Sequence, residues 1–253
     1  MTSPVQERSD QHAVPADSSG LTRPSLGERG ADIGRRPVTG ALIAANVIGY
    51  LAMLVCLFHH MGADIFMHSR ILASFGPEEL LRCGANYGPY SLAGQSWRLM
   101  TCLFMHSGFL HLAWNMFFLW GLGRQLEMLL GGAKTLAVYL LSGIGGSLAS
   151  AWFDPTMVSV GASGCIAGIA GYLLAVMVFA KPDLPMSQRR SIWLWAVFLM
   201  PLSIISGFFS EHTDNAGHLG GLVSGALIGA TGVFRVVGPN GLLRNNLKKS
   251  GAP

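Results

Sequence analysis

Long apolar segments recur along the chain, and short polar stretches separate them. The hydrocarbon core of a bilayer is about 30 Å thick and needs about 20 residues of helix to cross it. Six segments approach this length: about 39–58, 103–123, 134–153, 163–180, 191–209 and 216–234. We therefore predict an all-α polytopic membrane protein with six transmembrane helices, of which the fourth is the shortest.

Polar stretches flank this series at both ends. Residues 1–36 are rich in Ser, Pro, Gly, Asp and Arg and contain almost no large apolar residues, which is typical of a disordered tail. No apolar core follows the start as in a secretory signal, and five acids match five arginines, unlike a transit peptide. We expect a disordered tail at 1–36, a membrane domain at 37–234 and a second tail at 235–253.

The lysines and arginines predict the orientation, because these residues are enriched in cytoplasmic loops. With a cytoplasmic N-terminus, fourteen of the 17 lie in the tails or near the loops at 124–134 and 181–190. The outer side then receives three, all in the 59–102 connection. Both termini, and hence both tails, are predicted to be cytoplasmic.

The 59–102 connection is too long for a simple turn. Apolar residues such as Phe75 and Leu80 recur among polar ones, which favours short helices lying in the membrane interface. We interpret Trp97 and Arg98 as a boundary anchor, in which an interfacial aromatic ring lies beside a cation that extends toward water.

Composition narrows the function classes. Hydrophobic residues make up 51% of the chain and charged residues 12%, whereas soluble domains carry about 25% charged residues. This composition argues strongly against a soluble enzyme. The net charge of +4 is modest and its basic residues are scattered, so nucleic acid is not an expected partner. The four cysteines lack C-x-x-C spacing, so we predict neither a zinc site nor a disulfide framework, and we expect no cofactor.

A few polar side chains lie inside the predicted spans, where they are costly and often functional. They are His106, His111, Asn115, Ser163, His218 and, near a cytoplasmic end, Glu127. Taken singly, each also fits a structural role, because span histidines and asparagines can join helices and small residues permit tight packing. For Glu127 the structural interpretation is an ion pair with Arg124, three residues earlier.

Four of these residues share one depth near the outer boundary. The second span runs inward, and His111 and Asn115 lie four residues apart on one face of its outer half. Ser163 and His218 begin the fourth and sixth spans, which also start outside. Independent structural contacts would not require this coincidence, so we expect one site.

If Ser163 begins a helix, the 154–162 loop must dip below the outer surface, which is tolerated where a loop lines a water-filled cavity.

The four side chains have complementary chemistry. Ser163 can act as a nucleophile with His218 as its general base, the minimal pair for acyl transfer. Asn115 and His111 can donate to a developing oxyanion. No acid is placed within the spans to orient His218, which favours a dyad over a triad. Three acids of the outer loops remain open as partners of His218: Asp154, Glu211 and Asp214.

Glycines predict a close approach between the fourth and sixth spans. A small residue at every fourth position forms a ridge along a helix and lets two backbones approach closely. The sixth span has such a ridge at Gly217, Gly221, Gly225 and Gly229. The fourth span offers Gly164, Ala167, Gly168 and Gly171. We expect these ridges to bring Ser163 within reach of His218.

Several segments together resemble the rhomboid intramembrane serine proteases. They are Trp97-Arg98, the run from His106 to Met116 (HSGFLHLAWNM), Gly161-Ala162-Ser163-Gly164, and Ala216 to Gly221 (AGHLGG). The resemblance covers about 39–234 and departs from the family at none of the catalytic positions.

The resemblance implies a six-helix core and a catalytic dyad of Ser163 and His218. It also implies that His111 and Asn115 bind the oxyanion, and that transmembrane substrates enter through a lateral gate. Glu127 and the loop at Trp97 and Arg98 would be structural, with Glu127 stabilising the second helix and its loop.

The sequence lacks the catalytic motifs of other protease classes. The chain contains no H-E-x-x-H motif and no pair of aspartates within spans, and Cys165 breaks a G-x-S-x-G elbow. Two interpretations stay open: a serine endopeptidase that cleaves transmembrane segments near the outer leaflet, or a non-proteolytic rhomboid-like factor that binds or remodels membrane helices. We expect transmembrane protein substrates and the lipid bilayer as partners. The expected location is the bacterial cell (inner) membrane, as a multi-pass protein.

Overall fold

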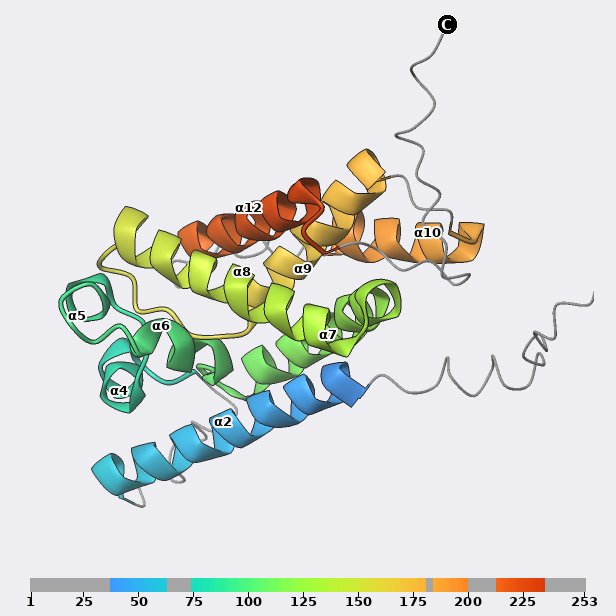
Figure 1. Cartoon of the computed structure of the whole chain (residues 1–253). Helices are drawn as coiled ribbons and strands as arrows, with labels where there is room; N and C mark the ends of the chain where they lie inside the picture. The colour runs from blue at the N-terminus through green and yellow to red at the C-terminus, as the bar shows by residue number, and fades with distance from the viewer. Residues whose placement is uncertain (1–36, 63–73, 181–183, 200–212, 235–253) are drawn as a thin grey trace, which may run out of the picture. The chain divides into compact units, whose positions relative to one another are not determined.

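The computed structural model describes residues 37–62, 74–180, 184–199 and 213–234, all within one compact unit at 36–253. Apart from one isolated β-bridge between Asn86 and Ser159, these residues form helices and the loops between them (Figure 1). The tails predicted at 1–36 and 235–253 lie outside the described residues.

Most of the described chain is helical. The α-helices are α2 (Pro37–Met61), α4 (Pro77–Cys83), α5 (Gly88–Ser91), α6 (Arg98–Thr101), α7 (Phe109–Leu130), α8 (Gly132–Phe153), α9 (Ser163–Ala175), α10 (Met186–Trp193) and α12 (Asn215–Thr231). A 3₁₀ turn, η1 (Cys102–Phe104), follows α6, and π-helical stretches, η2 (Val176–Ala180) and η3 (Leu194–Leu199), continue α9 and α10. Gly131, with a φ of 78°, is the single residue between α7 and α8 and allows the chain to reverse there.

Among the described residues, three helical segments are long and apolar enough to cross a membrane: Pro37–His60, Gly132–Phe153 and Ser163–Ala180. A fourth span is possible by length if Arg98–Phe104 and Phe109–Leu130, bent by 89°, act as one. The chain is thus a multi-pass membrane protein by these criteria. The predicted fifth span, 191–209, lies partly outside the described residues, and α12 has 17 residues.

The predicted bounds of the second span were wrong. The chain bends between η1 and α7, and the helix runs from Phe109 to Leu130 rather than from 103 to 123. Hydropathy alone missed this bend because the residues on both sides of it are apolar. Gly108, in an extended conformation, precedes α7 and starts the helix in a new direction.

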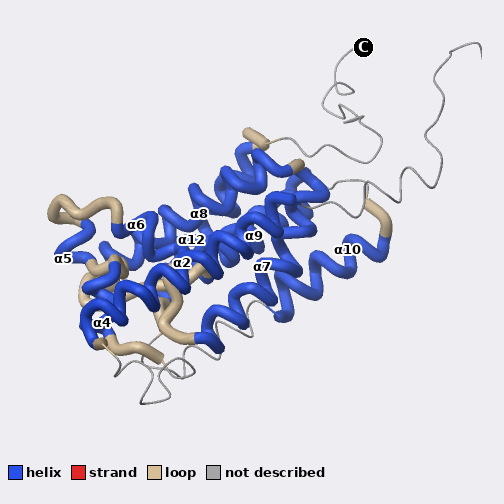
Figure 2. Tube along the Cα trace, turned by 90° about the horizontal axis from the view of Figure 1, so that it is seen from below, coloured by secondary structure: helices blue, strands red, loops and turns tan. Residues whose placement is uncertain are grey.

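Helix α9 lies at the centre of the packing. It contacts α7, α8 and α12, while α2 packs beside α7 (Figures 1 and 2). Its side chains Ile169, Tyr172 and Leu173 are completely buried. Large apolar side chains that remain exposed, such as Leu51 on α2 and Leu227 on α12, suit contact with lipid tails.

Glycines set the distance between α9 and α12, as the ridge pattern predicted. A Cβ on Gly221 would overlap the carbonyl oxygen of Gly164, and one on Gly225 would overlap that of Gly168. Both obstacles are backbone atoms, which cannot move aside as a flexible side chain can. The two helices can therefore reach their observed separation only if these positions are glycine, which has no Cβ.

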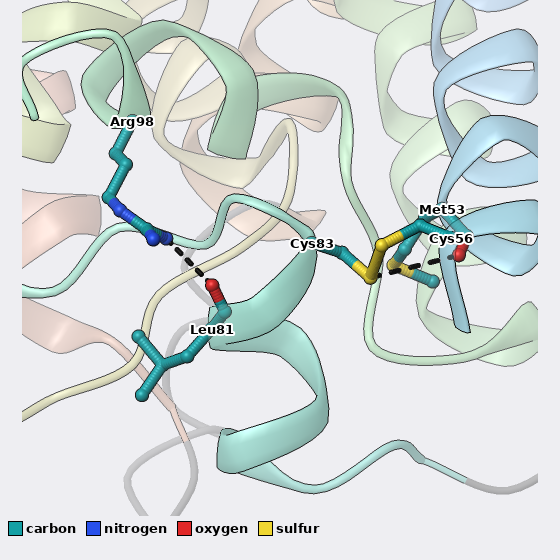
Figure 3. The surroundings of a disulfide bond; sticks show 5 residues. All are labelled: Met53, Cys56, Leu81, Cys83 and Arg98. Carbon is teal, nitrogen blue, oxygen red and sulfur yellow. Dashed lines mark hydrogen bonds between the residues drawn. A yellow bond between two sulfur atoms is a disulfide. The ribbon is translucent and has the colours of Figure 1, made fainter. Parts of the chain in front are cut away.

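The described part of the 59–102 connection contains three short helices, α4, α5 and α6, so the prediction of short helices there is confirmed. Their position in the membrane interface stays a prediction. The boundary-anchor interpretation of Arg98 was wrong, because this side chain is buried. Its guanidinium donates to the carbonyl oxygen of Leu81 at 2.8 Å (Figure 3). It also donates to the carbonyl oxygen of Ala85 at 2.9 Å. It also stacks on the Trp97 ring at 4.7 Å. Arg98 thus binds one carbonyl group of α4 and one in the turn after it.

A disulfide joins Cys56 near the end of α2 to Cys83 at the end of α4 (Figure 3). The expectation of no disulfide was wrong for this pair, since the fold brings together two helix ends that are 27 residues apart in sequence. Both cysteines belong to the side that the lysines and arginines predict to be outside, where disulfides form in oxidising compartments. Cys102 and Cys165 are free and buried.

Reducing this disulfide is expected to lower the stability of the domain. Closing a loop of this length typically contributes about 2–4 kcal/mol by restricting the unfolded chain. The melting temperature in detergent should therefore fall when a phosphine reductant is added. The Cys56→Ser and Cys83→Ser double variant should melt at the reduced temperature with or without reductant. Identical melting of the wild type in both conditions would mean that the bond does not restrict the chain.

Candidate active site

Ser163 is the first residue of α9, as the sequence predicted. Two contacts hold the loop before it: Ser159 and Asn86 exchange backbone hydrogen bonds of 2.9 and 3.0 Å, and the Gly161 N–H donates to the Cys102 carbonyl at 2.9 Å. Gly161 has a φ of 123°, which a residue with a side chain rarely adopts. Ser163 thus lies at a helix N-terminus, where backbone N–H groups lack intrahelical partners.

His218 lies in the first turn of α12 and reaches Ser163 across the helix interface. Its Nε2 is 2.8 Å from the Ser163 Oγ, although the residues are 55 positions apart in sequence. The other ring nitrogen, Nδ1, is buried and has no hydrogen-bond partner among the described residues. The structure therefore brings together the two residues that the sequence paired.

His111 and Asn115 lie on α7 against the same loop. The His111 Nδ1 is 3.0 Å from the Ser107 hydroxyl. The other ring nitrogen, Nε2, lies beside Gly161, since a Cβ added to this glycine would be 2.9 Å from it. The Asn115 amide donates to the His111 carbonyl at 2.9 Å and would lie 3.8 Å from the same Cβ. Both side chains thus adjoin the segment that ends at Ser163.

A cavity of about 760 Å³ surrounds this constellation. Ser163, His111 and His218 line it together with the 156–160 segment and two acids, Asp154 and Asp214. Asn115 is not among the lining residues, so its contact with the site passes through the Gly161 region. The lining includes polar side chains of the loop before α9, so this loop borders a cavity, as predicted. That water fills the cavity stays a prediction.

The family assignment agrees with this geometry. The family model described as the Rhomboid domain matches residues 93–235, which include Ser163, His218, His111 and Asn115. The chain belongs to the rhomboid family.

Named relatives are rhomboid proteases or rhomboid-like proteins. "Rhomboid protease AarA" of Providencia stuartii is 37% identical over 170 residues, which cover 59% of this chain and 60% of that protein. "Rhomboid protease GluP" of Bacillus subtilis (strain 168) is 36% identical over 152 residues, 60% of this chain and 29% of that protein. "RHOMBOID-like protein 1" of Arabidopsis thaliana is 34% identical over 201 residues, 78% of this chain and 51% of that protein. The matches thus span 29% to 60% of these relatives.

Glu127 has a different partner in this rhomboid domain from the one its spacing suggested. Its Oε1 accepts the Val38 N–H at 3.0 Å, and its Oε2 accepts the Thr39 N–H at 2.9 Å and the Thr39 hydroxyl at 2.7 Å. The predicted ion pair with Arg124 was wrong, since the Arg124 guanidinium stacks on the Trp120 ring at 4.9 Å. Glu127 instead caps the first turn of α2, whose N–H groups and positive dipole end favour a carboxylate.

The sequence left three acids open as partners of His218, and the structure gives a definite contact to one of them, Asp214. Asp214 is the N-cap residue of α12, and its Oδ1 accepts the Gly217 N–H at 2.7 Å. Aspartate three residues before that amide is a common N-cap arrangement, so this spacing could have identified it. Asp154 lines the cavity, and Glu211 lies outside the described residues.

Proposed function

We propose that this protein is an intramembrane serine endopeptidase with a dyad of Ser163 and His218. The observation that supports the proposal best is the 2.8 Å approach of the Ser163 Oγ to the His218 Nε2 at the wall of a cavity. Its named relatives include rhomboid proteases, which favours the same reaction.

The reaction follows from these two side chains. His218 Nε2 takes the proton of the Ser163 hydroxyl as the oxygen attacks a peptide carbonyl of the substrate. The same nitrogen then protonates the leaving amine, and an acyl group stays on Ser163. A water from the cavity attacks this acyl group, again with His218 as the base, and releases the second product.

His111, Asn115 and the backbone N–H of Ser163 would stabilise the oxyanion of each tetrahedral intermediate. The Ser107 hydroxyl at 3.0 Å can donate to the His111 Nδ1, and the His111 proton is then on Nε2. That nitrogen adjoins Gly161, two residues before the nucleophile. Ser107 would thus select the tautomer of His111 that donates toward the reacting carbonyl.

The wider setting belongs to the same proposal. Six spans with both termini cytoplasmic place the dyad near the outer leaflet, and transmembrane substrates would enter through a lateral gate. A helical peptide bond is shielded by its own hydrogen bonds, so the substrate must unwind locally before attack. We propose a bacterial inner membrane as the location and a cut near the outer end of the substrate helix.

Asn115→Ala is expected to slow cleavage about 100- to 1000-fold, because losing one oxyanion donor costs about 2.7–4 kcal/mol of the barrier. The melting temperature in detergent should change little, since the amide donates to a carbonyl of its own helix. Turnover of a transmembrane peptide and thermal unfolding check this together. If melting temperature falls as steeply as activity, Asn115 holds helices together instead.

A fluorophosphonate tests the proposed function without a known substrate. The purified protein should form a covalent adduct at Ser163, mapped by peptide mass spectrometry, and the adduct should be absent in His218→Ala. Cleavage products of a model transmembrane peptide then locate the cut. A folded wild-type protein that neither forms the adduct nor cleaves would support a non-proteolytic rhomboid-like factor.

A further inference from the structure

The general base of the proposed dyad occupies an unfavourable position for its chemistry. His218 is the fourth residue of α12 and so lies in its first turn. The N-terminus of a helix carries about half a positive charge, which disfavours a nearby cation. His218 must nevertheless become an imidazolium each time it takes the proton of Ser163.

The usual compensation for that charge is missing at the imidazole itself. In a Ser-His-Asp triad, a carboxylate bonded to the second ring nitrogen stabilises the imidazolium. The His218 Nδ1 is buried without such a partner among the described residues. Any compensating charge from the described part of the chain must therefore act from a short distance rather than through a direct bond to Nδ1.

Asp214 supplies a carboxylate at this helix end. Its backbone carbonyl accepts the His218 N–H at 3.1 Å, and its Oδ1 accepts the Gly217 N–H at 2.7 Å. A Cβ on Gly217 would overlap this carboxylate, so the glycine leaves room for it. Asp214 thus holds the turn that carries His218 and places a negative charge against the positive end of the helix.

Asp214 also borders the same spaces as the reacting groups. Asp214 lines the large cavity with Ser163 and His218. It also lines a second niche of about 10 Å³ with the same two residues. None of the other described residues that line this niche is acidic. Asp154, by contrast, borders the large cavity without reaching the niche.

We propose that Asp214 is the positioning residue of His218, which caps α12 to orient the imidazole and offsets the positive helix end as the imidazolium forms. The inference rests on the proposed function, since it assigns a partner to the same base. It differs from a triad because the carboxylate acts from the helix N-cap, one turn before the histidine, and not on the imidazole Nδ1.

Two substitutions separate the charge from the cap. Asp214→Asn keeps a side-chain oxygen that can cap the helix but removes the charge, whereas Asp214→Ala removes both. Asp214→Asn should lower kcat about two- to thirtyfold, the range expected for a charge at a helix end, with KM and melting temperature nearly unchanged. Asp214→Ala should lose at least as much kcat and also melt earlier. Asp154→Asn is the matched control and should keep wild-type kcat.

The rate of fluorophosphonate labelling at Ser163 provides a readout that needs no substrate. It should fall in Asp214→Asn by a factor similar to that of kcat. Wild-type kcat and labelling in Asp214→Asn would overturn the proposal while the protease function stands. An equal loss in Asp154→Asn would also overturn it, because the loss of any negative charge from the cavity lining would then lower the rate, whether or not that charge lies at the N-cap of α12. A folded wild type that neither labels nor cleaves would instead overturn the proposed function.

Discussion

Ser163→Ala is expected to reduce cleavage of a transmembrane substrate to background, a loss of about 10⁴-fold or more. The variant lacks the Ser163 Oγ, which lies 2.8 Å from the His218 Nε2, so no acyl intermediate can form. His218→Ala should cause a comparable loss, because an unassisted serine hydroxyl is a weak nucleophile. Turnover of a fluorogenic transmembrane peptide in proteoliposomes measures both.

The double variant distinguishes a dyad from two independent contributions. Residues that act as a unit give strongly non-additive losses, so Ser163→Ala with His218→Ala should be about as inactive as either single change. Thr156→Ala removes another hydroxyl of the cavity lining and should retain nearly wild-type turnover. Substantial turnover in purified Ser163→Ala would contradict the proposed mechanism.

The sequence predicted the parts of this site that depend on helix periodicity. Residues four apart share a helix face, so the placement of His111 with Asn115 could be predicted. The four-residue glycine spacing predicted the close contact of α12 with α9, and this contact brings Ser163 and His218 together.

Features formed between distant segments could not be predicted in this way. The Cys56–Cys83 bond and the cap that Glu127 provides for α2 each join residues that only the fold brings close. Arg98 was misread for a related reason: beside Trp97 it fits an interfacial anchor, but the carbonyl groups that it satisfies come from α4 and the turn after it. Hydropathy likewise carries no signal for the bend before Phe109.

Gly221→Val is expected to abolish most cleavage although Gly221 has no side chain and takes no part in the chemistry. A Cβ at this position would overlap the Gly164 carbonyl oxygen, directly after the nucleophile, so α12 must shift away from α9. Misplacement of reacting groups by about 1 Å can cost roughly 100-fold in rate. Overpacking of this kind also costs about 1–3 kcal/mol of stability, so the melting temperature should fall as well.

Gly229→Val separates misplacement of the dyad from loss of stability. A Cβ there would lie 2.9 Å from the Tyr172 carbonyl oxygen, about three turns further along α12 from His218. We expect a comparable loss of melting temperature with a much smaller loss of rate, because the strain arises far from Ser163. Leu227→Val, at a side chain that is 61% exposed, should change neither. If Gly221→Val and Gly229→Val lose activity only in proportion to melting temperature, the glycine contact stabilises the domain without setting the distance between Ser163 and His218.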